Sequence, residues 1–546
     1  MALTSLPFAL FALITGIIYF AVPKKKYQWV VLLIASSFFY VYNSFQYTAF
    51  ILVTIITIYL AATTMAAISK NTKAEVKAHK DEWSKEEKKA FKEASQKKRL
   101  HILTACLVLN FGILFFLKYF NFFSGSIAMM LGGSPDNAPQ IHLLLPLGVS
   151  FYTFIATGYL IDVYRETVEP EKNIFKFALF VSFFPQIIQG PISSYSKLHS
   201  QLTEEHRLEW LNFKQGVMNI FWGLFKKLVI ADCAWRGIKV YYDNGGIHGT
   251  PDFDGYGGSM VLFISLLYAL QLYADFSGGI DISRGICRIM GIDLEVNFRQ
   301  PYFSKSISEY WRRWHITLGA WMKNYVFYPI AMSDLSKRIS KAIATSSFGK
   351  TAAGKHLSKV FTTAMASFIV FLLVGIWHGA NSRYIGFGVW NGLIIMLSAM
   401  LGPVYDKSRN GLHINSEAAW WKLFQMIRTF IIVLIGYIFD IADNYTNAIQ
   451  MMKLIISDQN KSVFLEQLST LGLHTTEYAT LVVGMVVLLY ISIRLERTSL
   501  DTPAELLERY SGFIQWLALV GLIMLVLVLG TYGPLYDPAE FVYQQF

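Results

Sequence analysis

The sequence predicts an all-α protein that crosses a membrane many times. Of its 546 residues 54% are hydrophobic and only 16% are charged, and the hydrophobic residues gather in long uncharged runs. Runs of about 20 apolar residues are long enough to span a bilayer as helices, which satisfy their own backbone hydrogen bonds. This composition excludes an ordinary soluble domain.

Eleven apolar runs are expected to form transmembrane helices. They lie near residues 5–22, 28–45, 48–68, 101–120, 143–163, 258–276, 360–378, 384–402, 421–441, 478–493 and 512–531. Two further segments, 174–192 and 214–231, are interrupted by Pro185 or by Lys226 and Lys227. Each of these could form a short span with a re-entrant or interfacial helix, so we expect about eleven to thirteen crossings.

Basic loops predict the orientation, because Lys and Arg are enriched on the cytoplasmic side. Lys24–Lys26, Lys70–Arg99 and Lys337–Lys359 should all be cytoplasmic, which places both termini outside the cytoplasm. The net charge of +11 is therefore mostly membrane-orienting charge. Membrane lipids are expected partners, and nucleic acid is not.

His378 lies at the end of the uncharged run Phe361–Trp377, within the segment Gly375–Asn381. A titratable imidazole there costs free energy unless it lines a polar cavity, so we expect a functional site. The small residues around it would let a substrate approach the backbone. The alternative is an interfacial histidine that hydrogen-bonds to a carbonyl group.

A Trp-rich helix is expected to follow Ser306, because Ser306 and Glu309 fit a capping box. The helix can continue toward Tyr328, where Pro329 disfavours further helix. One face would carry large apolar side chains at three- and four-residue steps, namely Trp311, Trp314, Leu318, Trp321 and Tyr325. This stripe is typical of an amphipathic helix at the inner membrane interface.

Arg312, Arg313 and His315 lie off that stripe. They would guide an anionic, phosphate-bearing donor toward the core, because guanidinium groups bind phosphate well. The alternative is that this helix only anchors the chain at the membrane surface.

Asp275 ends an apolar run and precedes Phe276-Ser-Gly-Gly279. At the membrane edge its carboxylate would pair with a nearby arginine or help to shape a polar cavity. Asn297–Tyr302 is expected to form an irregular loop. The eleven histidines include no HExxH motif and no close pair, so no metal site is expected.

Six blocks of residues occur in order along positions 100–400. They are Leu145–Phe154 with Tyr159–Tyr164, Phe183–Pro191, Asp275–Gly278, Asn297–Phe298, Tyr310–Leu318 and Trp377–Ala380. Together they resemble the membrane-bound O-acyltransferase family, in its bacterial alginate O-acetyltransferase branch. The resemblance implies many helices around a central tunnel, which opens to the cytosol for an acyl donor and to the outside through a funnel.

The same resemblance implies a division of the chain. Transmembrane helices at 1–69 and a charged cytoplasmic loop at 70–99, which would form a hairpin or helix, would precede a catalytic core at 100–402. A C-terminal transmembrane extension at 403–546 would end in an aromatic tail.

The resemblance also implies roles for single residues. The histidine of the Trp-His-Gly block is catalytic in this family, which here is His378, and His315 corresponds to a second important histidine. Trp314, Trp377 and Asn381 are expected to contact substrate. Asn381 or a backbone N–H would steady the oxyanion.

The implied donor substrate is acetyl-CoA, with no permanently bound cofactor. The implied acceptor is a cell-surface or secreted polysaccharide, which is acetylated directly or through an extracytoplasmic partner of the SGNH-hydrolase type. The implied location is the bacterial plasma membrane.

The chain ends in an aromatic tail, Phe541–Phe546, after a span that the topology sends outward. Related acylation systems have a similar tail, and its tyrosine is proposed to relay the acyl group. Tyr543 would have this role here, with Gln544 standing where that tail has Phe. The alternative is an interfacial aromatic anchor.

Two other functions remain as alternatives. A D-alanyl transfer protein for teichoic acids would use a carrier-protein thioester and would need a docking surface for that carrier. A transporter or flippase would need charged residues along a path through the membrane. The runs contain few charges and the chain has no internal repeat, which favours the enzyme.

Overall fold

The computed structural model describes residues 1–134, 137–141, 146–243, 256–458 and 461–533. These residues form helices and no β-strand, apart from one isolated antiparallel bridge between Phe298 and Trp314. The all-α fold class is confirmed. Contacts divide the chain into two compact units, so the division at 69, 99 and 402 stays a prediction.

The first unit consists of Met1–Val217 and Ser283–Glu295. Its helices are α1 (Leu6–Ala21), α2 (Gln28–Ser44), α3 (Thr48–Ala78), α4 (Lys85–Met130), α5 (Val149–Tyr164), α6 (Ile174–Ser182), α7 (Phe184–Gln189) and α8 (Tyr195–Thr203), with short 3₁₀ turns η1 (Lys25–Tyr27) and η2 (Phe45–Tyr47). Two more helices, α9 (Trp210–Leu224) and α11 (Gly258–Ile289), contribute to both units.

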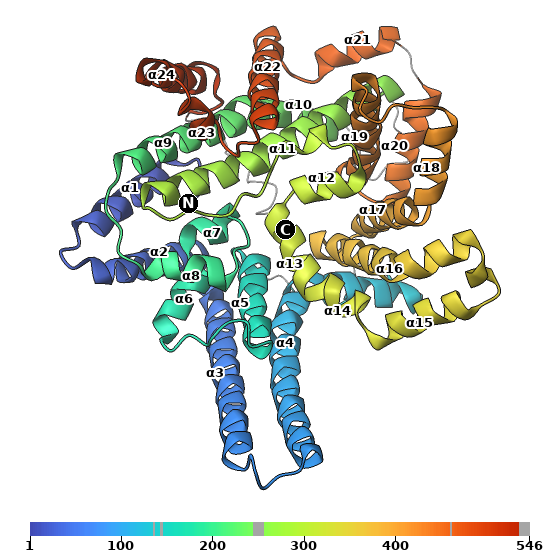
Figure 1. The fold of residues 1–546 in the computed structure, drawn as a ribbon. Helices are drawn as coiled ribbons and strands as arrows, with labels where there is room; N and C mark the ends of the chain where they lie inside the picture. Colours follow the sequence, from blue (N-terminus) through green and yellow to red (C-terminus); the bar gives the residue numbers. More distant parts are fainter. Residues whose placement is uncertain (135–136, 142–145, 244–255, 459–460, 534–546) are drawn as a thin grey trace. The chain divides into compact units, whose positions relative to one another are not determined.

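Helices α3 and α4 form a long hairpin within this unit, as Figure 1 shows. The basic stretch predicted at 70–99 forms its tip, and Ser84 starts α4 with a capping box. Both arms contact Glu166, just beyond α5. Ser69 donates a hydrogen bond to its carboxylate (2.5 Å), and Lys73 and Arg99 each form an ion pair with it (2.6 Å). This carboxylate therefore ties the hairpin to α5.

The two interrupted segments are broken where the sequence predicts. Between α6 and α7 the backbone leaves the helix at Phe183, and Pro185 lies in the first turn of α7. After α9 the chain forms a π-helical turn, η4 (Phe225–Ala231), which contains Lys226 and Lys227. Pro and π-bulges are common causes of such breaks.

The second unit consists of Met218–Ile282 and Val296–Phe546. Its helices are α10 (Asp232–Tyr241), α12 (Ile307–Arg313), α13 (Ile316–Met322), α14 (Tyr328–Ala331), α15 (Asp334–Thr345), α16 (Ala352–His378), α17 (Ser382–Met400), α18 (Gly402–Gly411), α19 (Ala419–Ile441), α20 (Tyr445–Ser457), α21 (Lys461–Thr470), α22 (Thr475–Thr498), α23 (Pro503–Leu507) and α24 (Gly512–Leu529), with short turns η6 (Pro301–Phe303), η7 (Lys323–Phe327, π-helical) and η8 (Phe348–Lys350).

Each of the eleven expected spans coincides with a helix over its described residues, and residues 143–145 of the expected span 143–163 lie outside them. Among the described residues, seven helical segments are long and apolar enough to cross a membrane, or eight if the bent pair α17–α18 is one span. The expected number is higher for two reasons. The segment Lys25–Ala78 includes both α2 and α3, and α1 and α5 have only 16 residues each. A helix of that length is just below the roughly 17 residues needed to span a bilayer.

Candidate active site

A cavity of about 260 Å³ in the second unit contains both predicted histidines. It lies among α12, α13, η7, α16 and α17. Its lining is mostly apolar, with the imidazoles and two cationic side chains as the main polar groups. The lining residues are Ser308, Trp311, Arg312, Trp314, His315, Leu318, Gly319, Met322, Lys323, Phe327, Ser367, Val370, Phe371, Val374, His378 and Ile395.

His378 is the last residue of α16 and is buried. Its ring lies among the aromatic rings of Trp377, Tyr384 and Phe387, with centroids 5.1, 6.1 and 5.3 Å away. These neighbours restrict the orientation of the imidazole at the end of the span. His378 therefore lines a cavity at the end of the span, but the walls are mostly apolar and not polar as predicted.

The glycines around His378 allow close packing of the helices. A Cβ at Gly375 would overlap the carbonyl oxygen of Tyr384, and a Cβ at Gly379 would overlap the Tyr384 ring. On α17, a Cβ at Gly388 would lie 2.6 Å from the Phe371 carbonyl oxygen. Small residues of this kind let two membrane helices approach closely. Helix packing therefore accounts for these glycines, and substrate approach to the backbone stays a prediction.

His315 lies at a sharp turn between α12 and α13. Its φ of 46° is in the left-handed region, which non-glycine residues adopt at an energetic cost. The ring is buried against Phe276, with centroids 4.8 Å apart in a T-shaped arrangement. Burial, with His378 nearby, lowers the pKa of His315 to about 3. This imidazole is therefore neutral at physiological pH.

The predicted continuous Trp-rich helix is broken at this turn. Ser306 caps α12 as expected, but the Glu309 carboxylate accepts from the Lys305 N–H (2.9 Å) instead of completing the capping box. The helix ends at Arg313, because Trp314 adopts extended backbone and bridges to Phe298. Trp314 and Trp321 are buried inside the protein. The prediction that the indoles lie at the membrane interface is therefore wrong for these two residues.

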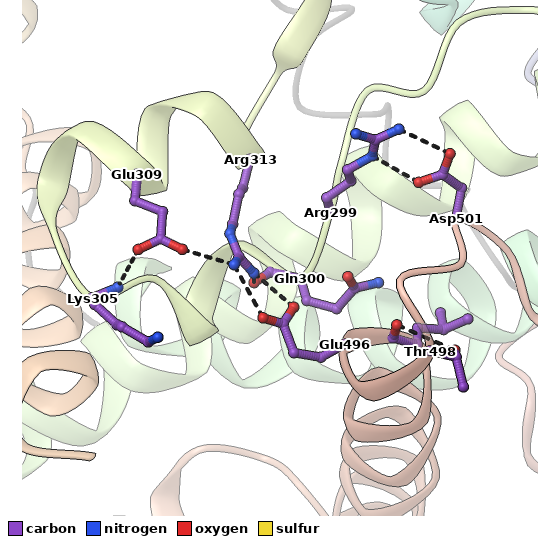
Figure 2. A network of polar contacts seen from close by, with 9 residues as sticks. Arg299, Gln300, Lys305, Glu309, Arg313, Glu496, Thr498 and Asp501 are labelled. Atoms are coloured by element: carbon purple, nitrogen blue, oxygen red, sulfur yellow. Dashed lines mark hydrogen bonds and ion pairs between the residues drawn. The ribbon is translucent and has the colours of Figure 1, made fainter. Parts of the chain in front are cut away.

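The adjacent residues Arg312 and Arg313 have different surroundings. Arg312 lines the cavity. The Arg313 guanidinium binds both oxygens of Glu496 (2.7 and 3.0 Å) and also Glu309 (2.7 Å), as Figure 2 shows. Two carboxylates thus compensate its charge, and Arg313 connects α12 to α22. Its role in donor binding stays a prediction.

Asp275 is buried in α11 and pairs with a lysine, not with the expected arginine. Its carboxylate lies 2.6 Å from Lys227 Nζ, and Asp232 lies 2.9 Å from the same amine. Next to this cluster, Lys226 binds Asp281 (2.7 Å). A buried charge is tolerated when it is paired in this way. Asp275 does not line the cavity of the two histidines.

The remaining candidates are distributed around the site. Trp314 lines the cavity, whereas Trp377 is buried beside His378. Asn381 caps α17, accepting from the Arg383 N–H (3.1 Å) and donating to the Asp443 carbonyl (2.9 Å). Its role at the oxyanion stays a prediction. Tyr543 lies outside the described residues.

Two cavity residues were missed in the sequence. Lys323 is a second cationic group in the lining, and Trp311, expected as a membrane anchor, forms part of the wall and donates to Asn391 Oδ1 (3.2 Å). The sequence signal for Lys323 is its position about two helical turns after His315, which can place both side chains on the same side. Across the described ranges, no group of three or more His, Cys, Asp or Glu side chains is arranged to hold a metal ion.

The chain is similar to known proteins in a family model and in curated relatives. A family model described as MBOAT, membrane-bound O-acyltransferase family, matches residues 170–348. The chain is 30% identical over 450 residues to the probable alginate O-acetylase AlgI of Pseudomonas putida, a match that covers 80% of this chain and 82% of that protein.

Two further relatives act on cell-wall polymers, according to their names. The peptidoglycan O-acetyltransferase of Helicobacter pylori is 28% identical over 72% of this chain and 73% of its own length. The teichoic acid D-alanyltransferase of Streptococcus thermophilus is 26% identical over 54% of this chain and 68% of its own length.

Proposed function

The chain belongs to the membrane-bound O-acyltransferase family, and we propose that it transfers an acetyl group from cytosolic acetyl-CoA to a hydroxyl group outside the cytoplasm. The product would be an O-acetylated cell-surface or secreted polysaccharide. The observation that carries the proposal is that His315 and His378 line the same cavity. Because the chain is an O-acyltransferase, the transporter alternative is dropped.

His378 acts as the general base in this proposal. A hydroxyl is a weak nucleophile at neutral pH, and a neutral imidazole can accept its proton during attack. The hydroxyl oxygen forms a C–O bond to the thioester carbonyl carbon, and the C–S bond to CoA breaks. The proton taken by the imidazole then passes to the CoA thiolate.

The cavity lining suits a short acyl donor. Arg312 and Lys323 supply cationic groups for CoA phosphates, and the apolar walls suit an acetyl thioester. Its volume of about 260 Å³ lies just below the roughly 300–1,000 Å³ of pockets that hold drug-sized ligands.

The acceptor side is proposed to face outward, with both termini extracytoplasmic. The charged CoA cannot cross the membrane, whereas an acetyl group can pass through a narrow tunnel. The first acceptor would be Tyr543 or a hydroxyl of an SGNH-type partner. Tyr543→Phe removes only the phenolic hydroxyl, so acetylation should fall if the relay exists and stay unchanged if the tail is an anchor.

The donor separates this proposal from D-alanyl transfer. Purified protein is reconstituted in liposomes and offered [¹⁴C]acetyl-CoA or a D-[¹⁴C]alanyl carrier protein, with the SGNH-type partner and a polysaccharide acceptor on the opposite side. We expect label on the polymer only from acetyl-CoA. Transfer from the carrier protein alone would instead assign the chain to the D-alanyl branch.

A further inference from the structure

The loop residue Asn297 is linked directly to the turn that contains His315. Its backbone carbonyl accepts the Ile316 N–H (3.0 Å), and its side-chain Oδ1 accepts both the Thr317 N–H (3.0 Å) and the Thr317 hydroxyl (2.9 Å). The neighbouring bridge between Phe298 and Trp314 keeps the two segments in register. Asn297 is therefore fixed relative to the His315 backbone.

The same oxygen determines which nitrogen of His315 carries a proton. Because a backbone N–H of Thr317 donates to it, the Asn297 atom at this place must be the carbonyl oxygen and not the amide nitrogen. His315 Nδ1 lies 3.1 Å from this oxygen. An oxygen that only accepts requires a proton on Nδ1, so the neutral ring has its acceptor lone pair on Nε2.

The amide nitrogen of Asn297, Nδ2, is destabilising in this arrangement. Asn297 is buried, and within the described ranges its Nδ2 has no hydrogen-bond partner. A buried unsatisfied donor lowers stability. The hydrogen bonds that Oδ1 accepts are therefore the reason for an asparagine at this position, since its Nδ2 makes none in the described part of the chain. A carboxylate at this position would satisfy the same donors but would also favour a charged imidazole.

We propose that Asn297 is a positioning residue, which holds His315 in the Nδ1–H tautomer so that Nε2 accepts a hydrogen bond during acyl transfer. This inference rests on the proposed function. The other titratable groups that line the cavity are His378, Arg312 and Lys323. Asn297 acts through His315 and need not touch the substrate.

The first test compares Asn297→Ala with Asn297→Asp in purified full-length protein, by acetyl transfer from acetyl-CoA between pH 5 and 9. Asn297→Ala should lower kcat by about tenfold or more, with little change in KM. Asn297→Asp restores an acceptor oxygen, so it should recover activity at high pH. Its carboxylate should also shift the acid limb of the profile to higher pH.

Asn110→Ala is the matched control, because Asn110 is an equally buried asparagine in α4 whose amide donates to the Cys106 carbonyl. This variant should lower the melting temperature without changing the pH profile. Wild-type kcat in Asn297→Ala would overturn the proposal. So would an Asn297→Asp variant that melts like the wild type yet is as inactive as Asn297→Ala at every pH.

A double-mutant cycle tests whether Asn297 acts through His315. In a His315→Ala background, Asn297→Ala should reduce kcat no further, because the ring that it orients is absent. An equal additional loss would assign Asn297 a separate structural role and contradict the inference. If the wild type itself shows no acetyl-CoA-dependent transfer, the proposed function fails instead. The two failures are therefore distinguishable.

Discussion

Arg312 and Arg313 are adjacent in sequence, yet one lines the cavity and the other is enclosed by the carboxylates of Glu309 and Glu496. Arg312→Ala should therefore raise KM for acetyl-CoA by about tenfold with a smaller effect on kcat. A hydrogen bond to a charged group contributes roughly 1.5–3 kcal/mol, and 1.4 kcal/mol is about tenfold in affinity. Steady-state kinetics with varied acetyl-CoA measures this.

Arg313→Ala is the neighbouring control. It leaves two carboxylates without their shared cation, so it should lower the melting temperature more than Arg312→Ala does. If Arg313→Ala raised KM as much as Arg312→Ala while the fold stayed equally stable, the assignment of these two arginines would be wrong.

The α16–α17 contact predicts a strong size limit at Gly388. Gly388→Ala places a methyl group against the Phe371 carbonyl, and overpacking of this kind costs about 1–3 kcal/mol. The melting temperature in detergent should fall by several degrees. Gly16→Ala is the control, since a Cβ at Gly16 in α1 meets no atom within 4 Å. Equal melting temperatures for both variants would contradict the close approach of α16 and α17.

Glu166 predicts a pH-dependent contribution to stability. Hydrogen bonds from Lys73 and Ser69, with Arg99 alongside, lower the pKa of Glu166 to about 2 from an ordinary value of 4.5. A lowered carboxyl pKa stabilises the fold above 4.5, and this stabilisation is lost as the pH falls toward 2. Glu166→Gln should therefore melt below the wild type at pH 7, and the difference should narrow at pH 3.

Thermal unfolding of both proteins at the two pH values checks this. Glu169→Gln is a suitable control, because Glu169 is an exposed carboxylate on the same loop. A Glu166→Gln difference that is identical at pH 7 and pH 3 would show that the carboxylate charge is not what ties the hairpin to α5.

Hydropathy predicted the helices well, because the requirement for an apolar surface acts on each span separately. Spans such as 28–45 and 421–441 coincide with α2 and α19. The breaks near Pro185 and at Lys226 were also visible, since proline and buried lysines interrupt a run locally. Both predicted histidines line one cavity, although only the resemblance linked them in the sequence.

The turn at His315 was not predictable, because its cause lies elsewhere in the chain. Helix periodicity is uninterrupted from Glu309 onward, but Asn297 and Phe298 pair with the turn only once the chain is folded. For the same reason the sequence does not distinguish the roles of Arg312 and Arg313. They differ because Glu496, distant in sequence, forms an ion pair with Arg313. A local sequence pattern such as helix periodicity does not predict contacts between residues that are distant in the sequence.

His378→Ala tests the central claim most directly. Cells that express the wild type, His378→Ala or His356→Ala are compared for the acetyl content of their extracellular polysaccharide at equal amounts of membrane protein. His356 is the matched control, because it lies on the same helix and contacts the Ala399 carbonyl (3.0 Å) outside the cavity lining.

We expect His378→Ala to lose acetylation by about a hundredfold or more, the usual contribution of a general base, while His356→Ala retains it. An acetyl content in His378→Ala equal to that of the wild type would contradict the proposal that this imidazole performs the transfer.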